Sequence, residues 1–178
     1  MIEFEEEIKQ RTIENIADQM LIAARTAPKA RGFDNLIIAK VTKEGILQIS
    51  EKMKEISIRD SVSFFKRDAE NIMYAESIVL IATKIRSIGL NCGLCGFENC
   101  ELKNKYPSVP CAFNTSDLGI AIGSAVSIAA DCRVDNRIMY SIGKAVKELN
   151  LLGNDAAIIF GIPLSSQGKN PFFDRKNI

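Results

Sequence analysis

Ser77-Ile78-Val79-Leu80-Ile81-Ala82-Thr83 is a nearly continuous apolar run. Its length and its β-branched residues predict a strand that is buried on both faces of a sheet. A second short segment rich in isoleucine and valine, residues 36–41, predicts another strand. Residues 156–162 predict the last strand, which we expect to end at Pro163. Strands mixed with helices in this order imply a layered domain of sheet and helices.

Helical segments lie between these strands. Apolar residues recur at helical spacing in five places, over residues 13–24, 46–56, 65–73, 118–130 and 138–152. Asp117 is placed to cap the fourth of these helices, and Gly153 is placed to end the fifth as the residue after its cap. The order of elements predicts an α+β fold, in which residues 1–178 form a single layered domain of sheet and helices.

Residues 90–114 show no clear period and contain all but one of the five cysteines. The sequence Cys92-Gly93-Leu94-Cys95-Gly96-Phe97-Glu98-Asn99-Cys100, followed by Cys111, has the spacing C-x2-C-x4-C-x10-C. A C-x2-C pair lets two thiolates reach one metal centre from a single turn, and two further cysteines complete a four-thiolate shell. We therefore expect residues 90–114 to form an inserted cluster-binding segment.

The spacing alone does not identify the metal. A three-cysteine run with a distant fourth is typical of iron–sulfur sites and favours a [4Fe–4S] cluster. A structural zinc is the alternative, although zinc ribbons usually present two C-x2-C pairs, and unligated or disulfide-bonded cysteines are a third. The remaining cysteine, Cys132, is interpreted as a small buried hydrophobe.

The composition excludes several classes of catalytic and metal-binding site. The chain has 178 residues, 47% of them hydrophobic, with no histidine and no tryptophan. The absence of histidine excludes Ser-His-Asp and Cys-His catalysis and histidine-ligated metals. Because 23 basic residues face 22 acidic ones, the formal net charge is +1, which argues against nucleic-acid binding through bulk charge.

No membrane or export segment is expected. The N-terminus is acidic, unlike the basic start of a signal peptide. The longest near-apolar stretch, residues 118–130, is 13 residues long and too short to span a bilayer. These features predict a cytoplasmic protein, in which clustered cysteines bind metal more often than they form disulfides.

In the cysteine run and in three later segments, the chain resembles a family of uncharacterised proteins described as containing a ferredoxin domain. The matching pieces are residues 92–100, 117–125, 135–141 and 161–165. The cysteine run is also similar to the four-cysteine [4Fe–4S] module of corrinoid iron–sulfur proteins, which have a longer gap to the last cysteine. The resemblance implies an iron–sulfur redox protein in which Cys92, Cys95, Cys100 and Cys111 are the ligands.

A weaker resemblance is to the flavin-dependent nitroreductase fold. It rests on Ala24-Arg25-Thr26-Ala27-Pro28 after an opening helix, a central small-residue helix and a late Gly-Ile-Pro strand end. It implies a nitroreductase-like layered sheet, a homodimer and FMN at the subunit interface. In a flavin-binding protein, loop and tail cations would hold the flavin phosphate. The candidates are Arg25, Lys29, Arg31, Lys169, Arg175 and Lys176, which are otherwise solvated loop cations.

The function predicted from the sequence is electron transfer through a [4Fe–4S] cluster with an unknown redox partner. The alternatives are an FMN-dependent oxidoreductase of nitroreductase type and a zinc-stabilised interaction module without redox activity. Catalytic residues for an organic substrate are not identifiable from these patterns.

Overall fold

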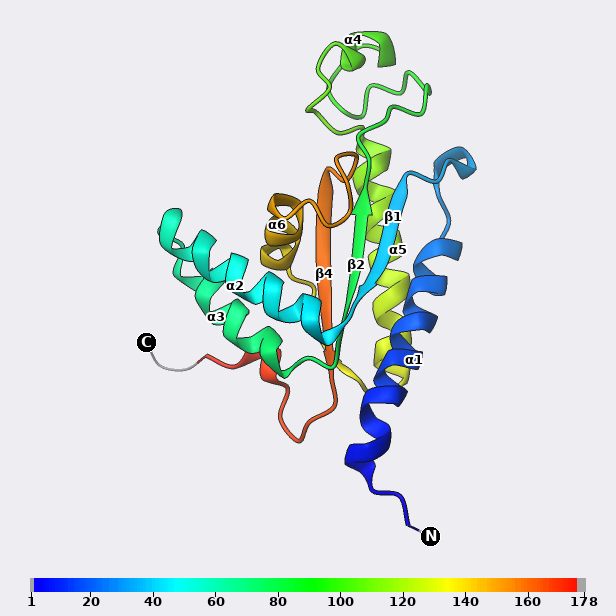
Figure 1. The fold of residues 1–178 in the computed structure, drawn as a ribbon. Coiled ribbons are helices and arrows are strands. Elements are labelled where there is room, and N and C mark those ends of the chain that lie inside the picture. The colour runs from blue at the N-terminus through cyan, green and yellow to red at the C-terminus, as the bar shows by residue number, and fades with distance from the viewer. Residues whose placement is uncertain (1, 176–178) are drawn as a thin grey trace.

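The computed structural model describes residues 2–175, which form one four-stranded antiparallel sheet with helices on both faces (Figure 1). The strand order is β1-β2-β4-β3. The strands are β1 (Leu36–Val41), β2 (Ser77–Thr83), β3 (Asp135–Asn136) and β4 (Ile158–Ser165). β2 is central and pairs with β1 from Leu36↔Thr83 onward and with β4 from Ser77↔Leu164 onward.

Two helical layers cover the sheet. On one face lie α1 (Glu5–Thr26) and α5 (Ala112–Asp131), which pack against each other. On the other face lie α2 (Lys43–Arg59), α3 (Ser63–Asn71) and α6 (Tyr140–Glu148). The short helices are η1 (Ala30–Gly32), η2 (Ile72–Tyr74), α4 (Cys100–Asn104) and η3 (Pro171–Phe173).

β2 joins the two halves of the hydrophobic core. Its residues alternate between the layers, because successive side chains of a strand point to opposite faces. Ile78, Leu80 and Ala82 pack among α2, α3 and α6. Val79 and Ile81 pack among α1 and α5. All seven residues of β2 are buried, which confirms the predicted strand with two buried faces.

Pro163 does not end the last strand, contrary to the sequence-based expectation. It lies within β4, opposite Ile78. On the other side of β4, Gly161 exchanges two backbone hydrogen bonds with Met139. Two residues later, the nitrogen of Pro163 faces this same side, where β3 pairs only with Leu164 and Ser165. The missing N–H therefore removes no hydrogen bond between strands.

Two predicted helix ends are also wrong. The cap of α5 is Cys111, so Asp117 lies inside the helix, where it is buried and accepts hydrogen bonds from Ala30 N–H. α6 ends at Glu148, ahead of Gly153. The residue that adopts the left-handed conformation just after α6 is Asn150, with φ 54°, and asparagine is the residue after glycine that tolerates this conformation best.

The segment between β2 and α5 extends beyond the sheet as a separate protrusion (Figure 1). It contains one short helix, α4, and is otherwise irregular. Because α5 begins at Ala112, the last residues of the predicted insertion, Phe113 and Asn114, belong to that helix. No helix among residues 2–175 is long and apolar enough to cross a bilayer.

Candidate metal centre

Four cysteines reach the same place from three different elements. Cys92 and Cys95 lie in the irregular chain after β2, Cys100 is the first residue of α4, and Cys111 caps α5. The side chains of all four line one narrow cavity at the base of the protrusion. The structure thus brings together residues that the sequence places up to 19 positions apart.

The four cysteines differ in their exposure to solvent. Cys92 is exposed, Cys95 and Cys100 are half-buried, and Cys111 is buried. The cavity has a volume of about 10 Å³, which is room for about one water molecule. Among residues 2–175, no three Cys, Asp or Glu side chains are gathered closely enough to hold a metal ion.

Two glycines give this loop its curl. Gly93 has φ 71° and Gly96 has φ 84°, a region that residues with a side chain rarely adopt. The N–H of Gly96 donates to the carbonyl of Gly93 at 2.9 Å, which closes a tight turn between Cys92 and Phe97. Cys95 lies within this turn, and so both cysteines of the C-x2-C pair face the cavity.

The residue that holds the loop to α4 is Asn91, which the sequence did not single out. Its side-chain oxygen accepts a hydrogen bond from Cys100 N–H at 2.9 Å. Its own N–H donates to Cys100 Sγ at 3.4 Å. Backbone N–H groups directed at cysteine sulfur are the usual means of stabilising anionic sulfur in thiolate centres. Asn91 N–H is such a group, because it is directed at Cys100 Sγ.

The N-terminus of α5 also faces the cavity. Cys111 is the cap of this 20-residue helix, and Ala112 and Phe113 line the cavity beside it. No acidic residue lies in the first turn of α5. The helix dipole therefore places partial positive charge next to the cavity and favours negative charge there.

Lys103 is a further residue that sequence reasoning missed. It belongs to α4, lines the cavity of the four cysteines and is 2% exposed. The signal in the sequence was its spacing from Cys100, because residues three apart share one face of a helix.

A second cavity lies directly beside the first. It has a volume of about 400 Å³ and lies between the chain before β1 and the base of the protrusion. Cys100 lines both cavities. Arg86 and Asn35 line the second one, and the side-chain nitrogen of Asn35 is buried without a hydrogen-bond partner in the described chain. This cleft has the size of a small-molecule site and touches the cysteine centre.

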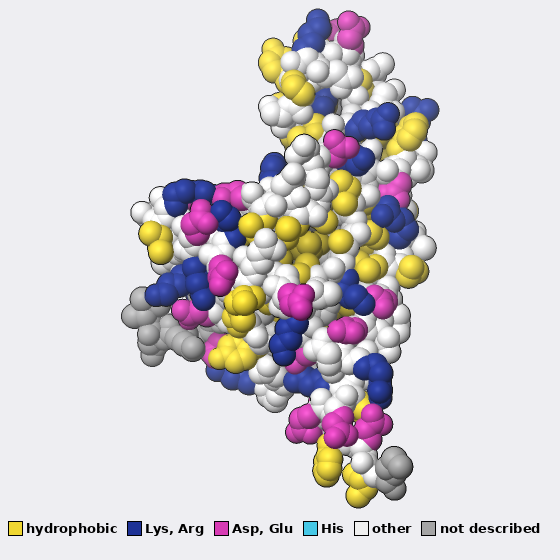
Figure 2. All heavy atoms as spheres, viewed as in Figure 1, with side chains coloured by type: hydrophobic (Ala, Val, Ile, Leu, Met, Phe, Trp, Pro, Cys, Tyr) yellow, Lys and Arg dark blue, Asp and Glu magenta, His cyan; other side chains and the backbone are white. Residues whose placement is uncertain are grey.

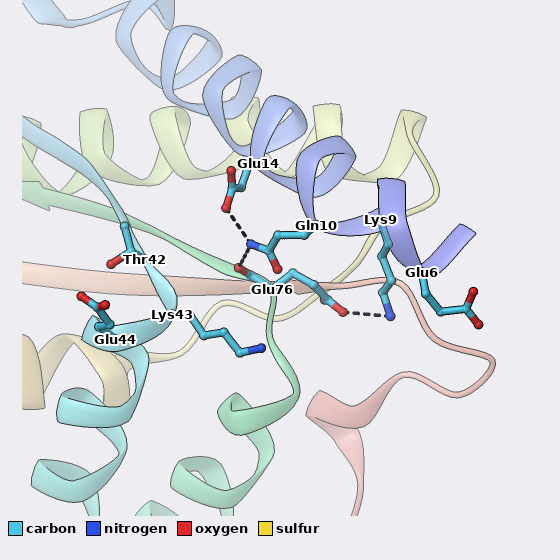
Figure 3. A pocket seen from close by; sticks show the side chains of 8 residues that line it. All are labelled: Glu6, Lys9, Gln10, Glu14, Thr42, Lys43, Glu44 and Glu76. Carbon is cyan, nitrogen blue, oxygen red and sulfur yellow. Dashed lines mark hydrogen bonds and ion pairs between the residues drawn. The ribbon is translucent and has the colours of Figure 1, made fainter. Parts of the chain in front are cut away.

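A larger groove, of about 660 Å³, lies at the opposite end of β2 (Figure 3). Lys9 forms an ion pair with Glu76 at 2.8 Å there. Gln10 donates from its side-chain nitrogen to Glu14 and to the carbonyl of Glu76. Four of the eight side chains that line this groove thus pair with one another. The groove lies at the Ser77 end of β2, whereas the cysteines follow Thr83.

The cations proposed for a flavin phosphate do not form one cluster in this chain. Arg25 and Lys29 lie at the end of α1, and Arg31 lies in η1. Arg25 pairs with Asp34, and Lys29 donates to three backbone carbonyls at the end of α1. Arg31 donates to the carbonyl of Ile88. The other candidates belong to the C-terminal tail, where Lys169 pairs with Asp174, Arg175 is exposed and Lys176 lies outside the described residues.

The contact with Arg25 also affects the pKa of Asp34. Partial burial raises this pKa, but the hydrogen bond from Arg25 and the N–H of Leu36 outweigh burial. The pKa of Asp34 therefore lies below its ordinary value, and the carboxylate stays charged at neutral pH.

Cys132 is exposed, so its interpretation as a buried hydrophobe is wrong. It is the C-terminal cap of α5, where the helix ends and the chain turns through Arg133 at φ 60°. The apolar helix before it suggested burial, but its last turn reaches the surface. Cys132 therefore stands at the opposite end of α5 from the cysteine cavity.

Comparison with known proteins gives matches over most of the chain. Residues 108–175 match the family model described as "Uncharacterized protein containing a ferredoxin domain (DUF2148)". An uncharacterized protein of Archaeoglobus fulgidus is 41% identical over 96% of both chains.

Solved structures with the same fold include nitroreductases. Nitroreductase CinD from Lactococcus lactis, in complex with nicotinic acid, matches with a TM-score of 0.64 and 12% identity, over 93% of this chain and 83% of that one. A nitroreductase with bound FMN from Desulfitobacterium hafniense matches with a TM-score of 0.61 and 14% identity, over 88% and 79%. These matches confirm the predicted α+β, nitroreductase-like fold.

Proposed function

The chain belongs to the family of uncharacterized proteins containing a ferredoxin domain, and on this premise we propose that it is a [4Fe–4S] redox protein. Cys92, Cys95, Cys100 and Cys111 are the proposed ligands. The observation that carries the proposal is that these four side chains line a single cavity. Cys111 is the most telling of them, because ten residues and a helix separate it from Cys100.

The surroundings of the cavity suit an anionic centre. A cluster bound by four thiolates is negatively charged, and it supplies uptake and release of one electron at a time. Asn91 N–H donates to sulfur, and the N-terminus of α5 faces the cavity. Cys111 is shielded from water by the body of the fold, whereas Cys92 is exposed. This gradient leaves an outer edge that a redox partner can approach.

The protrusion offers a contact surface around that edge. Figure 2 shows it standing above the body of the protein, with hydrophobic and basic side chains on its surface. Leu90, Leu94 and Tyr106 are exposed there. We propose that a protein electron carrier docks here, because short distance to the cluster and a mixed apolar and charged surface suit a transient complex.

A flavin enzyme is the second candidate, and the fold is the observation that favours it, since structural relatives contain FMN. The nitroreductase resemblance also implies a homodimer, which light scattering after size-exclusion chromatography would detect. The cleft lined by Cys100, Arg86 and Asn35 is available for a small molecule beside the cluster. Against a bound flavin phosphate, Arg25 and Lys29 are already engaged within the chain.

The test is anaerobic purification followed by quantification of iron, zinc, sulfide and flavin. A [4Fe–4S] protein is brown and contains equal amounts of iron and sulfide. Cys111→Ser should lose most of both, whereas Cys132→Ser, at the far end of α5, should retain them. Zinc without sulfide would replace the proposal with a zinc-stabilised module. Yellow protein that releases flavin on denaturation, without iron, would favour the flavin enzyme.

A further inference from the structure

Lys103 is an almost fully buried lysine that has no ion-pair partner in the described part of the chain. Its residue is 2% exposed. Among residues 2–175, its ammonium group has no hydrogen-bond acceptor and no carboxylate within ion-pair distance. Glu98 and Glu101 are close in sequence, but both are exposed and neither pairs with it. Lysine is almost never fully buried unless it is paired.

The location of Lys103 suggests what its partner is. Of the residues that line the cysteine cavity in the described chain, Lys103 alone is charged. A positive charge that is largely withdrawn from water is unfavourable unless it is paired, so negative charge in the cavity would stabilise Lys103. Four cysteine thiols supply that charge when they bind a cluster as thiolates.

We infer that Lys103 is the counter-ion of the thiolate-bound cluster and sets its reduction potential. This inference rests on the proposed function. The ligated cluster is anionic in both oxidation states, and reduction adds one electron and one further negative charge. A fixed positive charge beside the cavity stabilises the reduced state more than the oxidised state, and so it raises the potential. Lys103 acts through the cluster as a positioning and tuning residue.

The matched variants are Lys103→Met and Lys105→Met. Both remove one lysine charge from neighbouring positions, and methionine preserves much of the length of the apolar stem. Lys105 is exposed, so water and salt screen its charge. Anaerobic redox titration followed by visible absorbance and electron paramagnetic resonance measures the potential of each protein.

For Lys103→Met, the ratio of reduced to oxidised cluster at a fixed solution potential should fall about tenfold. A tenfold change corresponds to a midpoint about 59 mV lower for a one-electron couple. Lys105→Met should shift the ratio much less. Equal shifts in the two variants, or no shift in Lys103→Met, would overturn the inference.

Thermal unfolding supplies a readout that does not depend on activity. In cluster-free protein, Lys103→Met should leave the melting temperature unchanged or raise it, because it removes an unpaired buried charge. In cluster-loaded protein the same substitution should lower it, because the counter-ion is lost. A fall of equal size in both forms would show a purely structural role and contradict the inference.

Poor cluster loading of Lys103→Met would still give a decision. Lys103→Arg retains the charge and should restore iron retention and potential toward those of the wild type, whereas equal loss in both variants counts against a counter-ion. Failure of the proposed function itself looks different, because then the wild type contains no iron and sulfide at all.

Discussion

Asp117 accepts the backbone N–H of Ala30 with both carboxylate oxygens, each at 3.2 Å, and thereby joins α5 to η1. Asp117 is buried, and the residue it holds begins the turn that leads into β1. The carboxylate that sequence analysis took for a helix cap therefore makes a tertiary contact between α5 and the chain that leads from α1 into β1.

Removal of this contact should destabilise the whole protein. Asp117→Ala leaves the N–H of Ala30 without its acceptor, and we expect a loss of about 1–3 kcal/mol in the free energy of unfolding. Urea denaturation followed by circular dichroism measures the change. Ser116→Ala, on the exposed side of the same helix, is the control and should stay within about 0.5 kcal/mol of wild type. Equal effects of the two substitutions would contradict the assigned role.

Gly143 allows α6 to lie against β4 without a side chain between them. A Cβ atom at this position would be 1.7 Å from the carbonyl oxygen of Ile159 and 2.5 Å from its carbon, both of them backbone atoms. Gly143→Ala should therefore force α6 away from the sheet and cost about 3 kcal/mol or more.

Gly119→Ala is the matched control, because a Cβ atom there meets nothing within 4 Å. In the interior of α5 it should stabilise the protein by about 0.5–1 kcal/mol. Both variants are compared by the midpoint of urea unfolding. If Gly143→Ala unfolds at the same midpoint as wild type, the close approach of α6 to β4 is wrong.

The ends of α2 and α6 are joined by an ion-pair network with a defined pH dependence. Arg59 bonds both carboxylate oxygens of Glu148 at 2.8 Å and also contacts Asp60, which accepts from Lys144 as well. The hydrogen bond from Arg59 lowers the pKa of Glu148 below its ordinary value of 4.5. Hydrogen bonds from Arg59 and Lys144 lower the pKa of Asp60 below its ordinary value of 3.8.

A lowered pKa in the folded state gives stability that is present above the unfolded-state pKa and lost as the pH falls through the folded-state pKa. The contribution should thus be complete at pH 7 and should disappear below the ordinary carboxyl range. Because the groups are exposed, we expect a small effect that is reduced by salt. The difference in urea midpoint between wild type and Glu148→Gln should shrink from neutral to acidic pH. A difference that is constant with pH would contradict the role of this network.

The regular part of the fold was predictable because its signals are local. β1 and β2 have the bounds that their apolar runs predicted, since the residues of a strand themselves show which of its faces are buried. The errors at Pro163 and Asp117 have a common cause. Each residue type carries a strong local preference, and in each case a partner distant in sequence decided its place.

The sequence predicted one part of the candidate site and missed another. The spacing of the four cysteines identified the cavity, because metal-site ligands have characteristic separations. The spacing of Lys103 from Cys100 indicated a shared helix face, but neither the burial of Lys103 nor the cleft beside Cys100 was predictable. Burial of a lysine depends on which helix covers it, and the cleft is formed between residues before β1 and residues after β2.

Asn91 provides a test of how the loop holds a cluster. Because Asn91 has φ 49°, Asn91→Gly retains this conformation at little cost and removes only the side-chain oxygen that accepts Cys100 N–H. A lost hydrogen bond of about 1 kcal/mol corresponds to about fivefold in a rate. We therefore expect the visible absorbance of the cluster to bleach about fivefold faster in air than in wild type.

The control for this substitution is Asn150→Gly. Asn150 also adopts a left-handed conformation, with φ 54°, but it follows α6 and does not line the cysteine cavity. It carries the same chemical change, so any general effect of replacing a left-handed asparagine should appear there too. Bleaching at the wild-type rate in Asn91→Gly would mean that the contact with Cys100 does not restrain the loop. Faster bleaching in Asn91→Gly alone, with Asn150→Gly unchanged, would show that the hydrogen bond between Asn91 and Cys100 protects the proposed cluster.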